Sequence, residues 1–526
     1  MTATTITFYP LLGMASDLAA AGRYDEAAQQ VIAHLRSHPE EPQGLAKLGE
    51  IAMRLGALGQ AEHFLRRALA AGGRDIEIRR FLASVLDQQE RLTEAGELYA
   101  ALDQEAPDPR LSALRAHILD KLGRNAEART IHEQLTRDSA YDPRQWIALG
   151  NSQRAAGDVD AAIASYRHVI ARDEDFGEAW WALANIKSKV LTDDDVAAMQ
   201  KALAIAIDIR NIAPLHFALA RALHDRSRYA EAFDHYKQGN DLRAVDIGYD
   251  ARELSAEVAE IEHAVDAAFI ASLDQRPIGD AVPIFIVSLP RSGSTLLEQM
   301  LGSHRAIEAV GELPYAPAIL RSVMEMATRR GQVTVPQLVA SLSADQAAAM
   351  GQDYLRRAAM HRKTDRPFFI DKLPHNWSNI LFIRRILPQA KFLDIRRPAM
   401  DCCFSNFTHS FSSAHAASFR LADIGQCYAD YVRLMAHLDR VAPGLVHHID
   451  YAALVDDAEP HLRGALAHLG LEWDPSVLEF HTLDRVVRTP SSEQVRRPLN
   501  RDGMEIWRPY AEWLDPLRAT LGALAE

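Results

Sequence analysis

The sequence is short of cysteine, of basic residues and of long apolar runs, and each shortage excludes a class of protein. Its 526 residues include three cysteines, Cys402, Cys403 and Cys427. Three thiols cannot all pair and neighbouring cysteines seldom bridge each other, so we expect reduced thiols and a cytoplasmic location. No apolar run approaches the roughly 20 residues that a membrane helix requires. No basic residue precedes Arg23, so no secretory signal is expected.

The charge balance narrows the set of partners. Lys and Arg total 58 against 71 Asp and Glu, which gives a formal net charge of −13. A protein of this charge is not expected to bind nucleic acid or an anionic membrane, and an anionic ligand would need local basic residues. With 48% hydrophobic and 25% charged residues the chain is globular, and its length predicts two or three domains. The histidines lack metal-ligand spacing, so no metal site is expected.

The N-terminal third of the chain repeats. Ala27, Ala61, Ala95, Ala128 and Ala162 stand in similar helical contexts, at spacings of 34, 34, 33 and 34 residues. Small residues at this period let paired helices pack closely, and the pattern resembles the tetratricopeptide repeat. The sequence therefore predicts an all-α solenoid over residues 10–240 and a helical connector over residues 241–280.

Glycine marks the turn between the two helices of most repeats. Gly22, Gly56, Gly123 and Gly157 stand where a positive φ lets the second helix fold back. Glu90 has the corresponding place in the third repeat, so that turn is expected to form without glycine.

The function of the repeats has two interpretations. A concave solenoid face usually holds a protein or peptide, so the repeats would recruit an acceptor. In the alternative, they support or dimerise the domain that follows, and a homodimer remains open.

A strand, a loop of small residues and a helix are expected in order over residues 282–298. The stretch reads V-P-I-F-I-V-S-L-P-R-S-G-S-T-L-L-E. A buried strand leading through such a loop into a helix N-terminus directs backbone N–H groups and the helix dipole at one place. The stretch therefore predicts a phosphate cradle.

The cradle differs from the nucleotide-triphosphatase loop G-x-x-x-x-G-K-[ST], because it has one glycine, Gly293, and no lysine before Ser294 and Thr295. It has Arg291 and Ser292 instead. P-R-S-G-S-T-L-L resembles the 5′-phosphosulfate loop of sulfotransferases that use 3′-phosphoadenosine 5′-phosphosulfate (PAPS), particularly the tyrosylprotein sulfotransferase branch.

Three further apolar runs predict strands, at residues 367–370, 391–397 and 444–450, separated by helical segments. Alternation of strands and helices indicates a mostly parallel sheet with helices on both faces. The expected second domain is thus a P-loop-like α/β sulfotransferase domain over residues 281–520.

The resemblance rests on five motifs in the family's order. They are P-R-S-G-S-T-L-L, the G-E that ends at Glu312, the D-K-L-P that contains Lys372, Arg397 with Ser405, and S-S-E-Q-V-R-R-P-L-N from Ser491.

The resemblance implies a donor site in which the loop from Arg291 to Thr295 holds the 5′-phosphosulfate. Arg397 and Ser405 would hold the 3′-phosphate. The nucleotide would also be contacted by Tyr451, Gln494, Val495, Arg497 and Pro498.

The resemblance also implies the catalytic roles. Glu312 would be the general base, Lys372 and Arg291 would stabilise the transferred group and the leaving oxygen, and Ser491 would give a hydrogen bond. His375, three residues after Lys372, is the reserve candidate for the base. The acceptor would be a hydroxyl of a protein, peptide or small molecule.

Two departures favour another interpretation. His409 stands where the tyrosylprotein branch has an arginine, and Ile506 replaces a lysine before Trp507, with Arg508 and Arg496 as substitutes. The alternative function is a tetratricopeptide binding or scaffold protein whose C-terminal domain is a degenerate nucleotide-binding fold.

Overall fold

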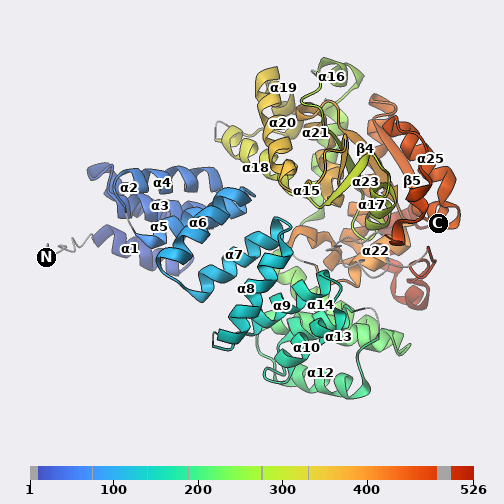
Figure 1. Cartoon of the computed structure of the whole chain (residues 1–526), viewed down its shortest axis with the longest axis horizontal. Coiled ribbons are helices and arrows are strands. Elements are labelled where there is room, and N and C mark those ends of the chain that lie inside the picture. Colours follow the sequence, from blue (N-terminus) through green and yellow to red (C-terminus); the bar gives the residue numbers. More distant parts are fainter. Residues whose placement is uncertain are drawn as a thin grey trace. The chain divides into compact units, whose positions relative to one another are not determined.

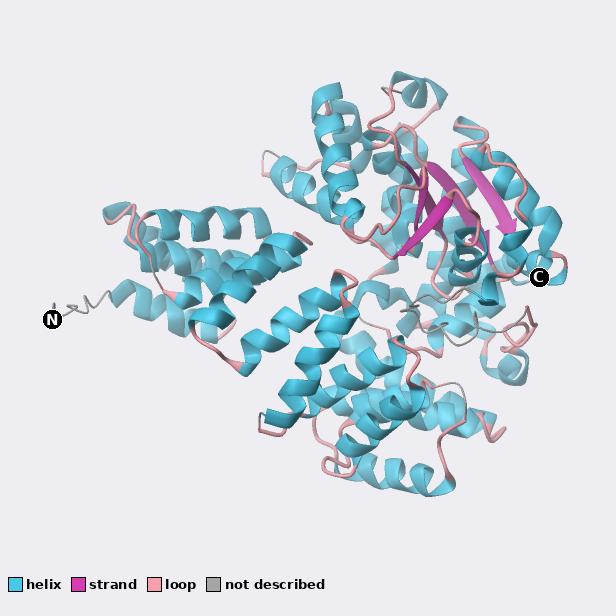
Figure 2. Ribbon diagram, in the orientation of Figure 1, coloured by secondary structure: helices cyan, strands magenta, loops and turns pink. Residues whose placement is uncertain are grey.

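The computed structural model describes residues 10–73, 75–138, 140–186, 189–273, 276–329, 331–411, 413–482 and 499–526. The chain divides into two compact units. One contains residues 1–139 with 318–333, and the other contains residues 140–317 with 334–526. Helical repeats precede a domain with a parallel sheet, which confirms the predicted fold class (Figures 1 and 2).

The repeat region is a series of paired helices. They are α1 (Pro10–Ala20), α2 (Tyr24–Ser37), α3 (Pro42–Arg54), α4 (Leu58–Ala70), α5 (Ile76–Gln88), α6 (Leu92–Glu105), α7 (Pro109–Lys121), α8 (Asn125–Asp138), α9 (Pro143–Ala155), α10 (Val159–Ile170), α11 (Gly177–Ala184), α12 (Asp193–Ile205), α13 (Ile209–His224) and α14 (Tyr229–Ile247). The periodic alanines, Ala27, Ala61, Ala95, Ala128 and Ala162, are fully buried. Their burial agrees with close helix packing.

The predicted turn glycines all have positive φ: Gly22, Gly56, Gly123 and Gly157 lie between 75° and 89°. Glu90 takes the same left-handed conformation, with φ at 56°. Its carboxylate lies 2.7 Å from the Nζ of Lys121, so an ion pair to the next repeat accompanies the strained backbone. Ser227 is a second turn residue of this kind, with φ at 59°.

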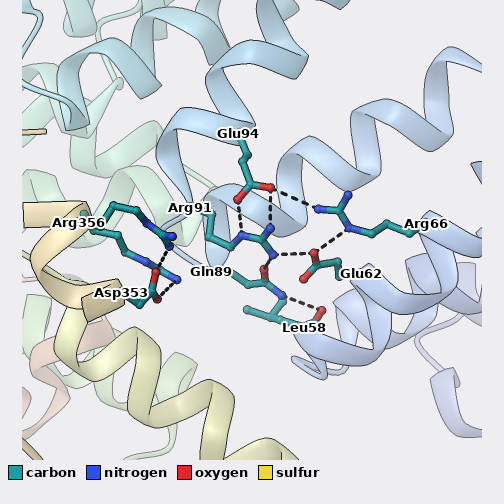
Figure 3. A network of polar contacts seen from close by, with 9 residues as sticks. Leu58, Glu62, Arg66, Gln89, Arg91, Glu94, Asp353 and Arg356 are labelled. Carbon is teal, nitrogen blue, oxygen red and sulfur yellow. Dashed lines mark hydrogen bonds and ion pairs between the residues drawn. The ribbon is translucent and has the colours of Figure 1, made fainter. Parts of the chain in front are cut away.

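Ion pairs also join successive repeats in the first unit. Arg91 lies 2.6 Å from Glu62 on α4 and 2.6 Å from Glu94 on α6 (Figure 3). Arg66 contacts the same two carboxylates, at 2.9 and 3.3 Å. A network of this kind holds neighbouring repeats in register, although exposed pairs contribute little individually.

The last repeats and the C-terminal domain lie in the same compact unit. Asn240 on α14 donates to the carbonyl of Phe407 at 2.8 Å, and His224 on α13 lies 2.7 Å from the hydroxyl of Tyr510. Helices α15 (Ala251–Ala264) and α16 (Ala267–Ser272) connect α14 to the sheet. The predicted boundaries at residues 240 and 281 remain a prediction, because the compact units follow a different division.

Five parallel strands form one sheet, in the order β2-β3-β1-β4-β5. They are β1 (Val282–Val287), β2 (Ile307–Gly311), β3 (Phe368–Asp371), β4 (Lys391–Arg396) and β5 (Val446–Asp450). The four predicted strands are present. β2 was not among the predicted strands.

Helices cover both faces of the sheet, as predicted. Ile284 and Ile286 of β1 share a core with Leu297 of α17 and Leu462 of α25. Phe285, between them, stacks on Phe392 of the next strand. The helices of this domain are α17 (Ser294–Gly302), α18 (Tyr315–Thr328), α19 (Val335–Ser341), α20 (Ala344–Ala359), α21 (Ile380–Ile386), α22 (Ala399–Phe407), α23 (Leu421–Val441), α24 (Tyr451–Asp456), α25 (Ala458–Leu469) and α26 (Asp515–Leu521). Among the described residues, no helix combines the length and apolarity needed to cross a membrane.

Candidate active site

The candidate residues stand where the five strands end. Ser288 follows β1, Glu312 follows β2, Lys372 follows β3, Arg397 follows β4, and Tyr451 begins the helix after β5. Because all strands are parallel, these five positions share one edge of the sheet. This is the edge at which open α/β sheets bind ligands.

The loop between β1 and α17 has an unusual backbone. Arg291 has φ at 67° and Gly293, the residue before the first turn of α17, has φ at 95°. Burial and the neighbouring charge of Arg397 lower the pKa of Arg291 to about 10, so its guanidinium stays charged at neutral pH. Two guanidinium groups close to one helix N-terminus favour an anion there.

Arg397 is almost fully buried and is held from several sides. Its Nη1 donates to the carbonyl of Arg291 at 2.9 Å, and its other Nη donates to the carbonyl of Gly503. Asp401 lies 3.7 Å away, and the guanidinium stands 5.7 Å from the centre of the Tyr451 ring. The structure thus brings Arg397, Arg291 and Tyr451 together.

Ser405 contacts the loop between β1 and α17. Its hydroxyl accepts a hydrogen bond from the Nε of Arg291 at 3.3 Å. The residue expected at the 3′-phosphate therefore also contacts the loop expected at the 5′-phosphosulfate.

Lys372 and Glu312 form an ion pair across the ends of β3 and β2. The lysine is 1% exposed and the glutamate side chain 46% exposed. A buried ammonium needs a partner, whereas the half-exposed carboxylate remains accessible to an acceptor.

Asp371 is a titratable residue at this edge that sequence reasoning missed. It is fully buried, and it accepts hydrogen bonds from the hydroxyl of Tyr354 at 2.8 Å and the backbone N–H of Leu313 at 3.2 Å. Burial raises its pKa to about 7. Its place in D-K-L-P, directly before the candidate lysine at a strand end, was the available signal.

The reserve base has a different environment. His375 is exposed in the short 3-10 helix η1 (Pro374–Asn379), and its ring lies 6.2 Å from that of His415.

Residues 491–498 of the late motif lie outside the described residues, and with them the predicted roles of Ser491, Gln494, Val495, Arg497 and Pro498. The two departures are described. The ring of His409 lies against Trp181 of α11, at 5.4 Å, and against Phe411, at 4.5 Å.

Ile506, the second departure from the family pattern, makes a hydrogen bond through its backbone. The N–H of Ile506 donates to Asp401 at 3.0 Å, and Arg508 pairs with Glu505 at 2.5 Å. Because Asp401 also lies 3.7 Å from Arg397, this hydrogen bond holds the backbone of Ile506 close to Arg397.

Several buried polar atoms at the strand ends have no hydrogen-bond partner among the described residues. They are the Oγ of Ser288, the Nε of Arg397 and the Nδ2 of Asn376. Such groups are rare in protein interiors except where a ligand or water binds. In the described ranges, no group of three or more His, Cys, Asp or Glu side chains is placed to hold a metal ion.

Comparison with known proteins agrees with this arrangement. Residues 283–475 match the model described as “Sulfotransferase family”. They form a sulfotransferase domain. Tetratricopeptide repeat models match residues 12–76, 52–118 and 147–208. Both resemblances inferred from the sequence are confirmed.

Two relatives of this chain differ from it in length. An uncharacterized protein of Aquifex aeolicus (strain VF5) is 30% identical over 332 residues, 62% of this chain and 44% of that protein. Protein-tyrosine sulfotransferase 1 of Danio rerio is 24% identical over 241 residues, 43% of this chain and 65% of that enzyme. The chain thus spans less than two thirds of each relative.

Among solved structures, the sulfotransferase domain of the Synechococcus PCC 7002 olefin synthase has 19% identity and a TM-score of 0.29, covering 46% of this chain and 98% of that one. A tetratricopeptide repeat protein from Parabacteroides merdae has 17% identity and a TM-score of 0.37, covering 44% of this chain and 91% of that one.

Proposed function

We propose that the protein is a PAPS-dependent sulfotransferase, which transfers a sulfuryl group to a hydroxyl of a protein, peptide or small-molecule acceptor. The observation that carries the proposal is the grouping of Arg291, Arg397 and Tyr451 beside the N-terminus of α17, at the carboxyl edge of the sheet. A nucleotide with anionic groups at both its 5′ and 3′ ends needs two such cationic places.

The residues present fit this donor. A Cβ on Gly293 would lie 2.3 Å from the Cδ2 of Tyr451, so the glycine lets the backbone of the loop pass beside the ring. The Nε of Arg397 has no protein partner in the described ranges and is available to an oxygen of the 3′-phosphate. Gln494, Val495, Arg497 and Pro498 remain proposed nucleotide contacts from the resemblance.

The donor supplies a sulfuryl group on a phosphate leaving group. In the proposed reaction, Glu312 takes the proton of the acceptor hydroxyl while the acceptor oxygen bonds to sulfur. Arg291 and Lys372 neutralise the charge that grows on the phosphate oxygen as the sulfur–oxygen bond to it breaks. Ser491 is proposed to donate a hydrogen bond to the transferred group.

The setting of the enzyme is also a proposal. The three cysteines are buried and free, which supports a reducing, cytoplasmic location. The repeats would recruit a protein or peptide acceptor, or assemble a homodimer.

The test is binding of 3′-phosphoadenosine 5′-phosphate (PAP) compared with ATP and ADP, measured by thermal shift and titration calorimetry. A ligand at 100 times its Kd stabilises the folded state by about 2.7 kcal/mol, so PAP should raise Tm clearly and ATP should not. Stabilisation by ATP alone would refute the donor assignment.

The replaced residues at His409 and Ile506 favour a second candidate, a repeat scaffold with a degenerate nucleotide-binding domain. Labelled donor supplied to a cell extract distinguishes the two. PAP binding without transfer of label to any acceptor would support the scaffold.

A further inference from the structure

One face of helix α22 contacts three successive residues of the phosphosulfate loop. Asn406 donates to the carbonyl of Pro290 at 2.8 Å. Ser405 accepts from the side chain of Arg291 at 3.3 Å. The Sγ of Cys402 lies 3.3 Å from the hydroxyl of Ser292 and 3.6 Å from the carbonyl of Pro290. Positions 402, 405 and 406 lie on one side of a helix because of its 3.6-residue period.

These contacts fix the direction of the loop's peptide groups. In a planar trans peptide, the carbonyl and the following N–H point in opposite directions. Asn406 holds the carbonyl of Pro290, and therefore directs the N–H of Arg291 away from α22. Arg397 holds the carbonyl of Arg291 at 2.9 Å and in the same way directs the N–H of Ser292.

The loop needs such support because its backbone is strained. Arg291 has a φ of 67°, a conformation that side chains other than glycine adopt only when their surroundings enforce it. Asn406 is 1% exposed, and inside the protein its amide nitrogen also donates to the carbonyl of Cys402 at 2.9 Å and lies 3.7 Å from the Sγ of Cys402. A buried amide with two carbonyl partners is a rigid support.

We propose that Asn406 and Cys402 are positioning residues for the donor. They hold Pro290–Ser292 in the shape that binds the 5′-phosphosulfate, without contacting the donor themselves. This inference rests on the proposed function, since the loop's ligand is taken to be PAPS.

The neighbouring cysteine provides a matched control. Cys402 and Cys403 are both fully buried on α22. The thiol of Cys403 points to the carbonyl of Ile424 on α23, at 3.7 Å, whereas that of Cys402 points to the loop. Substitution of either by alanine removes the same atom from the same helix, and only one of them contacts the loop.

The experiment measures Kd for PAP and for adenosine 5′-phosphosulfate by calorimetry, with Tm recorded for each full-length variant. Asn406→Leu removes the hydrogen-bond donor while keeping a similar side-chain volume. It should weaken the binding of both ligands about three- to tenfold. Cys402→Ala should weaken binding of both ligands about two- to fivefold. Cys402→Ser, which replaces the thiol by a hydroxyl able to make the same contacts, should keep most of the wild-type affinity. Cys403→Ala should lower Tm yet leave both Kd values within about twofold of wild type.

The outcomes separate the two proposals. Wild-type binding of PAP with unchanged Kd in Asn406→Leu and Cys402→Ala refutes the positioning role, because a purely structural effect would lower Tm alone. Failure of the wild type to bind PAP refutes the proposed function instead. In that case amide hydrogen exchange decides the positioning role: peptides covering residues 288–296 should exchange faster in Asn406→Leu than in Cys403→Ala, and equal rates would overturn it.

Discussion

Gly293 and Tyr451 lie in direct contact, although 158 residues separate them in the chain. A Cβ added to the glycine would stand 2.3 Å from the Cδ2 of the tyrosine ring. This distance is shorter than the contacts that Cβ atoms make in real proteins. The ring also lies 5.7 Å from the guanidinium of Arg397. The contact therefore links the loop after β1 to the ends of β4 and β5.

Gly293→Ala should damage both stability and donor binding. The new methyl group would displace the Tyr451 ring or the loop, and alanine is strained at a φ of 95°. We expect a loss of about 1–3 kcal/mol in unfolding free energy and weaker PAP binding, measured by urea unfolding and calorimetry. The double variant Gly293→Ala, Tyr451→Ala should recover part of the loss, because it removes the collision and keeps the strain. No recovery would mean that the collision is unimportant.

Arg397→Ala should change the preference between two nucleotides. The lost contact to a 3′-phosphate is charge-assisted and contributes about 1.5–3 kcal/mol. Arg397 also supports the carbonyl of Arg291, so adenosine 5′-phosphosulfate, which lacks the 3′-phosphate, should lose some affinity as well. The ratio of PAP affinity to adenosine 5′-phosphosulfate affinity should fall about ten- to hundredfold. An unchanged ratio would mean that the arginine only supports the loop.

Glu312→Gln should separate catalysis from binding. The amide keeps the size of the side chain and its reach to Lys372 but cannot accept a proton. A positioned general base contributes about 10²–10⁴-fold, so kcat should fall by that factor while PAP affinity changes little. The comparison variant is His375→Ala. Full turnover by Glu312→Gln with loss in His375→Ala would identify the histidine as the base.

Asp371 should make stability depend on pH. Its pKa is about 7 in the folded protein and 3.8 for an ordinary aspartate, so the folded state holds the proton more tightly. The unfolding free energy should therefore fall as pH rises from about 4 to about 7, by up to roughly 1.4 kcal/mol per pH unit from this group, and level off above that.

The matched variant is Asp371→Asn, which has no proton to lose. As pH rises from 5 to 8, the Tm of the wild type should fall relative to the Tm of Asp371→Asn. Parallel Tm curves for the two proteins over this range would show that Asp371 does not titrate there.

Removing all the repeats should expose the C-terminal domain. Tyr510 is fully buried, and its partners include His224 and Phe233 of the last repeats. We expect residues 241–526 to be poorly soluble, whereas residues 140–526, which keep these helices, should fold and bind PAP. Circular dichroism and calorimetry on the two truncated chains give the answer, and a soluble 241–526 with wild-type PAP affinity would support the boundary predicted from the sequence.

The strand missed in the sequence shows where local reasoning stops. β2 is short and has Glu308 as its second residue, and glutamate is unfavourable in a buried strand. In the folded protein, Glu308 accepts hydrogen bonds from Thr364, including one from its hydroxyl at 2.9 Å. These partners are 56 residues away, so no pattern within the strand could predict that the carboxylate would be satisfied.

The sequence by itself determined the helical repeats, the left-handed turns at Gly22 and Gly56, and the strand, loop and helix around Gly293. Each depends on interactions between near neighbours, which spacing and turn chemistry record. Only the tertiary structure decided that Asn406 holds Pro290, that Asp371 keeps a raised pKa, and that Tyr510 packs on His224. These features depend on burial and on hydrogen bonds between residues far apart in the chain, and such contacts exist only once the sheet and its helices have assembled.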